Sequence, residues 1–210
     1  MLSSQPAQPS SRLGVSTHME VAGALERDAQ LMLRVREGDQ TSFALLLERH
    51  RRPVVHFLYR MVQNQAVSEE LAQEVFLRVY RSRETYEPAA KFTTWLFRIA
   101  THLALNNLRD GKKEKGHESL DEELPGGSTR QVEDRQPTVE QRMVNEARLQ
   151  EVRNAITMLP PKQRAAVLMH KYEELEYAQI AGALGCTESA LKSLLFRAYE
   201  TLRSRLSHMA

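Results

Sequence analysis

The sequence predicts an all-α protein with two small helical domains joined by a flexible acidic linker, the C-terminal one a helix-turn-helix. Glycine is scarce at 9 of 210 residues, aromatic residues make up 6%, and the commonest residues are Leu, Ala, Arg and Glu, which favour helices over strands. Apolar residues recur at helical spacing along most of the chain. With 41% apolar residues, the chain is not disordered throughout.

Four segments follow from this pattern. Residues 1–27 are rich in Ser, Gln and Pro without a sustained period, which predicts a disordered N-terminal extension. This extension is either a regulatory contact or the result of a misassigned start codon, since Met19 opens a plausible shorter protein. Residues 28–110 are expected to form the first domain, 111–138 the interdomain linker and 139–210 the second domain.

The first domain is expected to begin with two helices. A short helix starts at Asp28 and stops at Gly38. Residues 39–42 offer N-caps for a second helix, which Pro53 should bend. The apolar positions of the second helix, which repeat at helical spacing, are Phe43, Leu46, Leu47, Val54, Leu58 and Met61.

A third and a fourth helix complete this domain. Ser68 is expected to cap the third helix, which runs to about Tyr86, where Glu87-Pro88 forces a break. The fourth covers roughly 93–109. At about 100° per residue, one narrow face of this helix carries Trp95, Arg98, His102, Asn106 and Arg109.

The narrow face of the fourth helix has the groups that hold unpaired bases. Rings stack on bases, cations contact the backbone and amides contact base edges. Lys91 and Phe92, just before the helix, add a cation and a ring. The alternative is that Trp95 and His102 are core residues over which the arginines extend.

The second domain is expected to contain four helices, over residues 139–158, 162–172, 177–184 and 188–206. Pro161 suits the first turn of the second of these, where a missing N–H costs nothing. Only Gly185, Cys186 and Thr187 separate the last two helices: glycine allows a left-handed exit, and threonine caps the next helix. This arrangement predicts a helix-turn-helix.

The last helix presents a polar arc opposite its apolar stripe. The stripe consists of Leu191, Leu195, Ala198 and Leu202. The opposite arc consists of Ser189, Lys192, Ser193, Phe196 and Arg203, with Arg197 beside it. Such a helix fits the major groove of DNA, where Lys and Arg reach guanine edges or phosphates. The alternative is an αα-hairpin whose charged face is simply solvated.

Charge is unevenly distributed along the chain. The net charge is only +2, but residues 91–115 carry a net charge of +4 and residues 117–140 one of −5. This asymmetry indicates one surface for phosphates and one segment that avoids or imitates them.

An enzymatic role has little support in the sequence. Cys186 lies in a turn and has no second cysteine to pair with. His50 and His56 are six residues apart, not the four of a helical metal site, and no glycine-rich phosphate loop is present. We expect no cofactor and no metal. With no apolar run long enough for a membrane span and no secretory signal, we expect a cytoplasmic protein.

Four blocks of the chain resemble the extracytoplasmic-function sigma factors of bacterial RNA polymerase. They are LMLRVREGDQTSFALLLERHRRPV, EELAQEVFLRVYRSRETY, FTTWLFRIATHLALNNLR and LPPKQRAAVLMHKYEELEYAQIAGALGCTESALKSLLFRAYETLR. The resemblance spans about 29–115 and 140–206. It implies core RNA polymerase and promoter DNA, both duplex and melted strand, as partners, together with an anti-sigma factor and no membrane insertion.

The resemblance also implies roles for residues. Polymerase binding falls to Glu70, Leu71, Gln73, Glu74, Phe76 and Arg78. Recognition and melting of the minus-ten element fall to Tyr86, Lys91, Phe92, Trp95, Arg98, His102, Asn106 and Arg109. Recognition of the minus-thirty-five element falls to Thr187, Ser189, Lys192, Ser193, Phe196 and Arg197. The linker would run toward the active site and RNA exit path, where its acidity imitates nucleic acid.

This sequence departs from the family pattern at a few positions. Leu194 stands where arginine is common, and Phe196 and Tyr199 replace polar or basic residues, so readout rests more on contacts with thymine methyls. Val67 replaces an acidic residue before Ser68. Two rival functions stay open, a stand-alone helix-turn-helix transcriptional regulator and a helical adaptor that binds only protein.

Overall fold

The structure is a computed structural model that describes residues 27–114, 139–173 and 175–209, and every regular element among them is a helix. After a helix over 27–36, the elements are α2 (Gln40–Val62), α3 (Gln65–Arg81), η1 (Arg83–Thr85), α4 (Phe92–Glu114), α5 (Val139–Thr157), α6 (Pro161–Lys171), α7 (Tyr177–Leu184), α8 (Glu188–Arg205) and η2 (Ser207–Met209). The expectations for 1–26 and 115–138 lie outside the described residues. Across the described ranges, no helix has both the length and the apolar character to cross a membrane.

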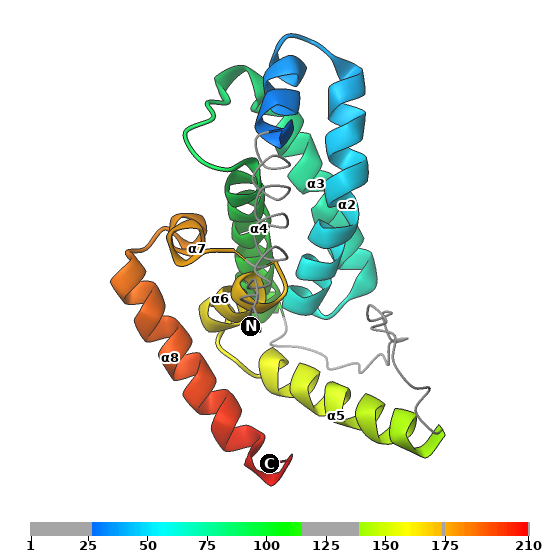
Figure 1. Ribbon diagram of the computed structural model, residues 1–210, viewed down its shortest axis with the longest axis vertical. Helices are drawn as coiled ribbons and strands as arrows, with labels where there is room; N and C mark the ends of the chain where they lie inside the picture. The colour runs from blue at the N-terminus through cyan, green and yellow to red at the C-terminus, as the bar shows by residue number, and fades with distance from the viewer. Residues whose placement is uncertain (1–26, 115–138, 174, 210) are drawn as a thin grey trace, which may run out of the picture.

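The first four helices form one bundle, in which α2, α3 and α4 pack against one another (Figure 1). Each helix turns an apolar stripe inward because its apolar residues recur at helical spacing. Fully buried side chains of this core include Met32, Leu46, Phe57, Leu58, Met61, Val75, Val79, Phe92 and Leu96. The rings of Phe57 and Phe97 meet edge to face with centroids 5.3 Å apart, which ties α2 to α4.

Local capping explains where α2 and α3 begin. The carboxylate of Asp39 accepts hydrogen bonds from the N–H groups of Thr41 and Ser42, as an N-cap does. The prediction that Ser68 caps the third helix is wrong. Asn64 holds that position and accepts from the N–H of Val67, while Ser68 is buried one turn inside α3 and its hydroxyl donates to the carbonyl of Gln65.

Some helix ends also differ from expectation. α3 stops at Arg81 and is followed by a short 3-10 turn, whereas the sequence predicted helix to about Tyr86. α4 continues to Glu114, past the expected end near 109, because Gly111 is tolerated within the helix. The chain between the first helix and α2 turns at Gly38, whose φ of +97° favours glycine.

α6, α7 and α8 form the predicted helix-turn-helix. Gly185 leaves α7 with φ +63°, and the hydroxyl of Thr187 accepts from the N–H of Ala190 to cap α8. α8 packs on α6 and α7 through its apolar stripe, where Leu191, Leu195 and Ala198 are buried. Pro161 occupies the first turn of α6, as predicted.

The two helical domains touch, with α6 and α7 lying against α2 and α4 (Figure 1). We call this the interdomain contact. Arg164 of α6 is buried and donates to the backbone carbonyl of Met61 at the end of α2. The Thr101 hydroxyl lies 3.9 Å from the sulfur of Met169, so α4 approaches α6 closely.

Candidate functional site

The predicted face of α4 is open to solvent over most of its length. Arg98, His102, Asn106 and Arg109 are exposed and follow one another along one side of the helix. Arg109 is paired with its neighbour Asp110, with 3.2 Å between Nε and Oδ1. Because this ion pair is exposed, it contributes little and leaves the guanidinium free to exchange partners.

Trp95 lies between the core and this exposed face. Its ring is partly buried, 5.0 Å from that of Tyr86 and 5.9 Å from that of Phe92, measured between centroids. Tyr86 and Phe92 are themselves buried, which differs from the expectation that both face DNA. In this structure they support Trp95 from beneath, because the loop before α4 folds back on the bundle.

A buried polar cluster holds that loop and was not predicted as a unit. Asp28 is buried, its Oδ2 lies 2.8 Å from Nε2 of His50, and Arg49 pairs with its other oxygen. The His50 ring lies 5.3 Å from that of Phe92, and Arg36 donates to the carbonyl of Tyr86 at 3.4 Å. The sequence pointed only to a helix start at residue 28, because the pair is separated by 22 positions.

Tyr86 is held neutral by these surroundings. Burial raises the pKa of its hydroxyl above the usual value, and the negative charge of Asp28 adds to the effect. Among the described residues, the hydroxyl has no hydrogen-bond partner. The ring of Tyr86 packs against that of Trp95.

Lys91 is the one predicted DNA contact that another part of the described chain engages through an ion pair. Its Nζ lies 2.9 Å from Oε1 of Glu176, at the start of α7. Both side chains are substantially exposed, so this ion pair is weak and screened by salt. A carboxylate of the second domain is thus paired with a lysine that the sequence assigned to DNA binding.

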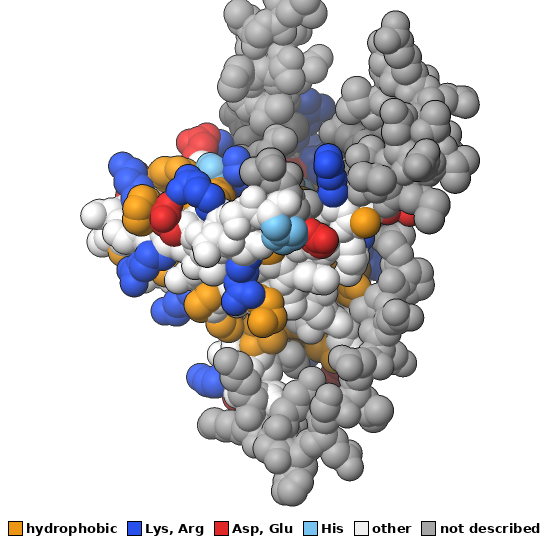
Figure 2. All heavy atoms as spheres, turned by 90° about the horizontal axis from the view of Figure 1, so that it is seen from below, with side chains coloured by type: hydrophobic (Ala, Val, Ile, Leu, Met, Phe, Trp, Pro, Cys, Tyr) orange, Lys and Arg blue, Asp and Glu red, His pale blue; other side chains and the backbone are white. Residues whose placement is uncertain are grey.

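The predicted DNA-reading residues of α8 lie together on its outer side, well away from α4. Those exposed there are Thr187, Ser189, Lys192, Ser193, Phe196 and Arg197. Figure 2 shows the end of the molecule toward which α8 runs, and Lys and Arg side chains predominate over acidic ones across its coloured part. Leu194 and Tyr199 are partly buried instead, and the hydroxyl of Tyr199 lies 2.9 Å from Nδ1 of His170. Tyr199, one of these two departures from the family pattern, therefore packs against the core of its own domain.

The predicted polymerase-binding residues are divided between the surface of α3 and its inner side. Glu70, Gln73 and Arg78 are exposed, whereas Phe76 is buried. Arg78 donates to Glu74 at 2.7 Å, and this hydrogen bond holds the pKa of that carboxyl below its usual value. The result is a polar ridge with opposite charges one helical turn apart.

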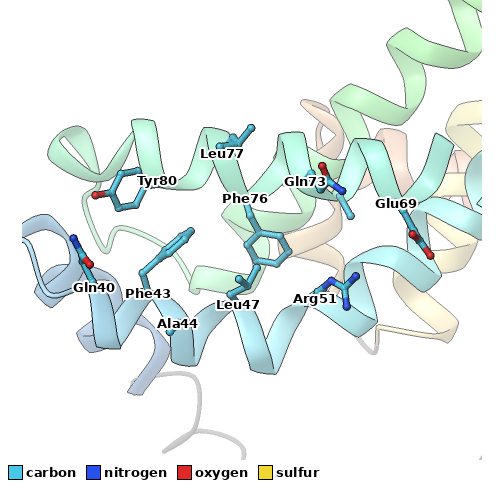
Figure 3. Close-up of a pocket in the computed structure, with 11 residues that line it drawn as sticks. Gln40, Phe43, Ala44, Leu47, Arg51, Glu69, Gln73, Phe76, Leu77 and Tyr80 are labelled. Atoms are coloured by element: carbon cyan, nitrogen blue, oxygen red, sulfur yellow. The ribbon is translucent and has the colours of Figure 1, made fainter. Parts of the chain in front are cut away.

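Beside this ridge, α2 and α3 enclose a groove of about 670 Å³ (Figure 3). Its floor and walls are mainly apolar, formed by Phe43, Ala44, Leu47, Ala72, Phe76, Leu77 and Tyr80. Its polar rim is formed by Gln40, Arg51, Glu69 and Gln73. Leu77, which lines the groove, exposes nearly half of its surface. The sequence analysis missed the α2 half of this groove, because it assigned Phe43 and Leu47 to the apolar stripe of the helix by their spacing alone.

Glu173 follows α6 and has an unusual environment. Burial raises the pKa of its carboxyl to about 7, and the nearby positive charge of Arg60 on α2 opposes part of that shift. The guanidinium of Arg60 in turn sits 4.1 Å from the ring centre of Tyr172. A proton-binding group therefore lies at the interdomain contact.

Comparisons with known proteins agree with this architecture. The family model described as sigma-70 region 2 matches residues 46–114, and the one described as sigma-70, region 4 matches residues 149–202. The chain is 33% identical over 178 residues to the RNA polymerase sigma factor CarQ of Myxococcus xanthus, covering 85% of this chain and 97% of that relative. It is 31% identical over 176 residues to the ECF RNA polymerase sigma factor SigW of Bacillus subtilis, covering 82% and 92%.

Two solved structures share the fold at low sequence identity. CnrH in complex with the cytosolic domain of CnrY matches with a TM-score of 0.64 and 17% identity, over 88% of this chain and 99% of that one. The sigma factor RpoE in complex with the anti-sigma factor NepR from Bartonella quintana matches with a TM-score of 0.63 and 19% identity, over 79% and 96%. The arrangement of helices is thus one already seen in experiment.

Proposed function

Since the chain belongs to the extracytoplasmic-function sigma factors of bacterial RNA polymerase, which are not enzymes, we propose a role for each of its three exposed surfaces. The protein directs RNA polymerase in promoter recognition and transcription initiation, with core RNA polymerase and promoter DNA as its partners. The observation that carries the proposal is that the α2–α3 groove, the α4 face and the α8 face are separate and all exposed.

The ridge and groove of α2 and α3 bind core polymerase. An apolar groove rimmed by charged and amide groups is the composition of a specific protein interface. Leu77 and Phe43 supply the apolar contact, while Gln73 and the Glu74–Arg78 ion pair set orientation. An exposed leucine on a helix gains the stabilisation of burial only when a partner covers it.

The exposed face of α4 holds the melted strand of the minus-ten element. Trp95 offers a partly exposed ring that Tyr86 and Phe92 hold in place, so a base stacks on it with little loss of side-chain entropy. His102 and Asn106 lie about two and three turns further on and reach base edges. Arg98 and Arg109 contact the phosphate backbone of the DNA strand.

The outer face of α8 binds the minus-thirty-five element as duplex. Thr187 fixes the start of the helix, and Ser189 and Lys192 lie in the N-terminal half that enters the major groove. The two promoter elements lie about 25 base pairs apart, roughly 85 Å at 3.4 Å per base pair. Because α7 lies against α4 here, the interdomain contact must open before both elements are bound at once.

The 24 residues 115–138 between the two domains permit that opening, because a chain of this length, fully extended, would reach about 80 Å, close to the separation of the two promoter elements. Polymerase, which binds both domains, then supplies the free energy of separation. We also propose a cytoplasmic location, where its polymerase partner works, and an anti-sigma factor as a further partner. The relatives solved with CnrY and with the anti-sigma factor NepR support that partner.

The experiment that tests the α4 assignment separates melting from docking. His102→Ala and Asn106→Ala should each reduce open-complex formation on duplex promoters about tenfold to a hundredfold, the value of one base contact. Both residues are exposed, so their loss leaves the fold intact. Asn107→Ala, an exposed amide turned 100° away, is the matched control and should leave open-complex formation unchanged.

A template with a pre-melted bubble should restore both variants, because strand separation is then no longer required of the protein. Lys192→Ala should instead weaken promoter capture on both templates. Equal activity of Asn106→Ala and Asn107→Ala on duplex DNA, read by permanganate footprinting of thymines, would refute the melting role of this face.

A further inference from the structure

The first helix, over residues 27–36, takes no part in the α2–α3 groove, the α4 face or the α8 face. It also lies outside the part of the chain that the sigma-70 region 2 model matches, residues 46–114. It lies at one end of the bundle, next to α2 and beside the loop that leads into α4 (Figure 1). Its apolar side packs into the core, but its charged residues Asp28 and Arg36 each reach another part of the domain.

Arg36 holds one end of the loop that precedes α4. Its Nη1 donates a hydrogen bond of 3.4 Å to the backbone carbonyl of Tyr86, which lies 50 positions further along the chain. Tyr86 directly follows the short 3-10 turn η1, so this bond fixes the backbone where the loop begins. The ring of Tyr86 lies 5.0 Å from that of Trp95 between centroids. Arg36 is thus linked to Trp95 through Tyr86.

Asp28 holds the other end of the same loop. Its Oδ2 lies 2.8 Å from Nε2 of His50 on α2, and the His50 ring lies 5.3 Å from that of Phe92. Phe92 is the first residue of α4, and its ring lies 5.9 Å from that of Trp95. Because Asp28, His50 and Phe92 are buried, water does not compete with this second link. Asp28 is thus linked to Trp95 through His50 and Phe92.

The two links therefore start on one helix and converge on one partly exposed ring. A ring that rotates freely loses side-chain entropy when a base stacks on it, whereas a ring that is already held loses little. Functional side chains keep a productive geometry when surrounding residues fix their rotamers. Contacts from both ends of the loop to Trp95 provide such support.

We propose that Arg36 and Asp28 are positioning residues for promoter melting, which act through Tyr86 and Phe92 to hold Trp95 in the orientation that a base of the melted strand requires. The proposal rests on the assignment of the α4 face to the melted strand and deepens it. Neither positioning residue contacts DNA in this arrangement. The first helix thereby contributes to melting of the minus-ten element, although it lies outside the matched family region.

The test uses Arg36→Met, because residue 36 is exposed and the change removes one hydrogen bond without opening the core. Polymerase holoenzyme that contains this variant should form open complexes on duplex promoters about threefold to tenfold less well, the effect of one hydrogen bond. A template with a pre-melted bubble should restore the variant, and Arg36→Lys should keep part of the activity. Arg34→Met is the matched control. It removes an exposed cation about 160° around the same helix and should leave open-complex formation unchanged.

Two further measurements separate positioning from a purely structural role. Trp95 is the only tryptophan of the chain, so intrinsic fluorescence reports on its ring alone. Its anisotropy in the free protein should fall in Arg36→Met and stay unchanged in Arg34→Met. In a Trp95→Leu background, which keeps an apolar side chain but offers no aromatic ring, Arg36→Met should cause no further loss of open complexes. A residue that stabilised only the fold would instead add its effect to that of Trp95→Leu.

Three outcomes would overturn the proposal. They are normal open-complex formation by Arg36→Met, an equal loss in Arg34→Met, or an undiminished effect of Arg36→Met in the Trp95→Leu background. Asn106→Ala distinguishes these from a failure of the α4 assignment. If Asn106→Ala loses open complexes while Arg36→Met does not, the α4 face keeps its role and only the positioning is wrong. If neither variant has an effect, the role of the α4 face itself is wrong.

Discussion

Replacing Arg164 with methionine should loosen the interdomain contact. Its guanidinium is buried and donates to three backbone carbonyls, those of Met61, Thr157 and Leu159. Only Met61 belongs to the other domain. Burial lowers the pKa of this guanidinium, because the site lacks the solvation of an exposed cation.

The magnitude follows from comparing the polar links between the domains. A hydrogen bond from a charged donor contributes about 1.5 to 3 kcal/mol. The exposed Lys91–Glu176 ion pair contributes about 0 to 1 kcal/mol, and Arg60 stacked on Tyr172 about 0.5 to 1 kcal/mol. Loss of the Arg164 bond should therefore shift the equilibrium between touching and separated domains about tenfold to 150-fold.

The assay measures a distance between the domains. Spin labels on Ala90→Cys and Ala178→Cys, in a Cys186→Ser background, sit beside the two residues of the Lys91–Glu176 ion pair, so they are close only while the domains touch. Arg164→Met should broaden the distance distribution toward long values.

The matched control is Lys162→Met, an exposed cation of the same helix, which should leave the distribution unchanged. Thermal unfolding serves as a second readout. We expect the free energy of unfolding to fall by about 1 to 3 kcal/mol in Arg164→Met. The hydrogen bonds that are lost outweigh the free energy regained when a charge is no longer buried. Identical distance distributions in Arg164→Met and wild type would refute the reasoning, whatever the change in stability.

Three further predictions concern single sites. The pKa of Glu173 is raised to about 7, so between pH 5 and 7 the folded state binds a proton that the unfolded state has lost. The free energy of unfolding should therefore fall by roughly 1 to 3 kcal/mol as pH rises from 5 to 8. Glu173→Gln should flatten this dependence of stability on pH in unfolding curves. Exchanging charges in Glu74→Lys/Arg78→Glu keeps an ion pair one turn apart, so helicity by circular dichroism should persist while copurification with core polymerase is lost. Asp28→Asn should weaken the support of Trp95 and lower its fluorescence anisotropy, whereas an unchanged anisotropy would contradict that link.

Features determined by short stretches of sequence were predictable. The turn between α7 and α8 depends on a glycine that adopts positive φ and on Thr187, whose hydroxyl caps the next helix, and both effects act within a few residues. The start of α3 shows the limit of such reasoning, because Asn64 and Ser68 are both good N-caps and only packing buries Ser68. The sequence alone does not show which of these two residues is the N-cap.

Features that depend on distant residues were not predictable. The family resemblance assigned Phe92 and Tyr86 to the minus-ten element, yet both are buried because Asp28 and His50 bring the first helix and α2 against that loop. The interdomain contact is similar: Lys91 meets a carboxylate 85 positions away, and no periodicity announces such a pair. The exposed groups of α4 and α8 were easier to identify, since amphipathic spacing alone decides which side of a helix faces solvent.

The Lys91–Glu176 ion pair bears on how easily promoter DNA separates the domains. The backbone N–H of Glu176 donates to Oε1 of Gln179 at 2.8 Å, so the start of α7 is held by a neighbour and not by the lysine. Exchanging this carboxylate for a phosphate replaces one exposed anion with another at nearly equal free energy. The resistance to separation therefore comes from Arg164 and the packed surface around it. A partner that binds both domains is thus needed before α4 and α8 reach together the two promoter elements that we propose for them.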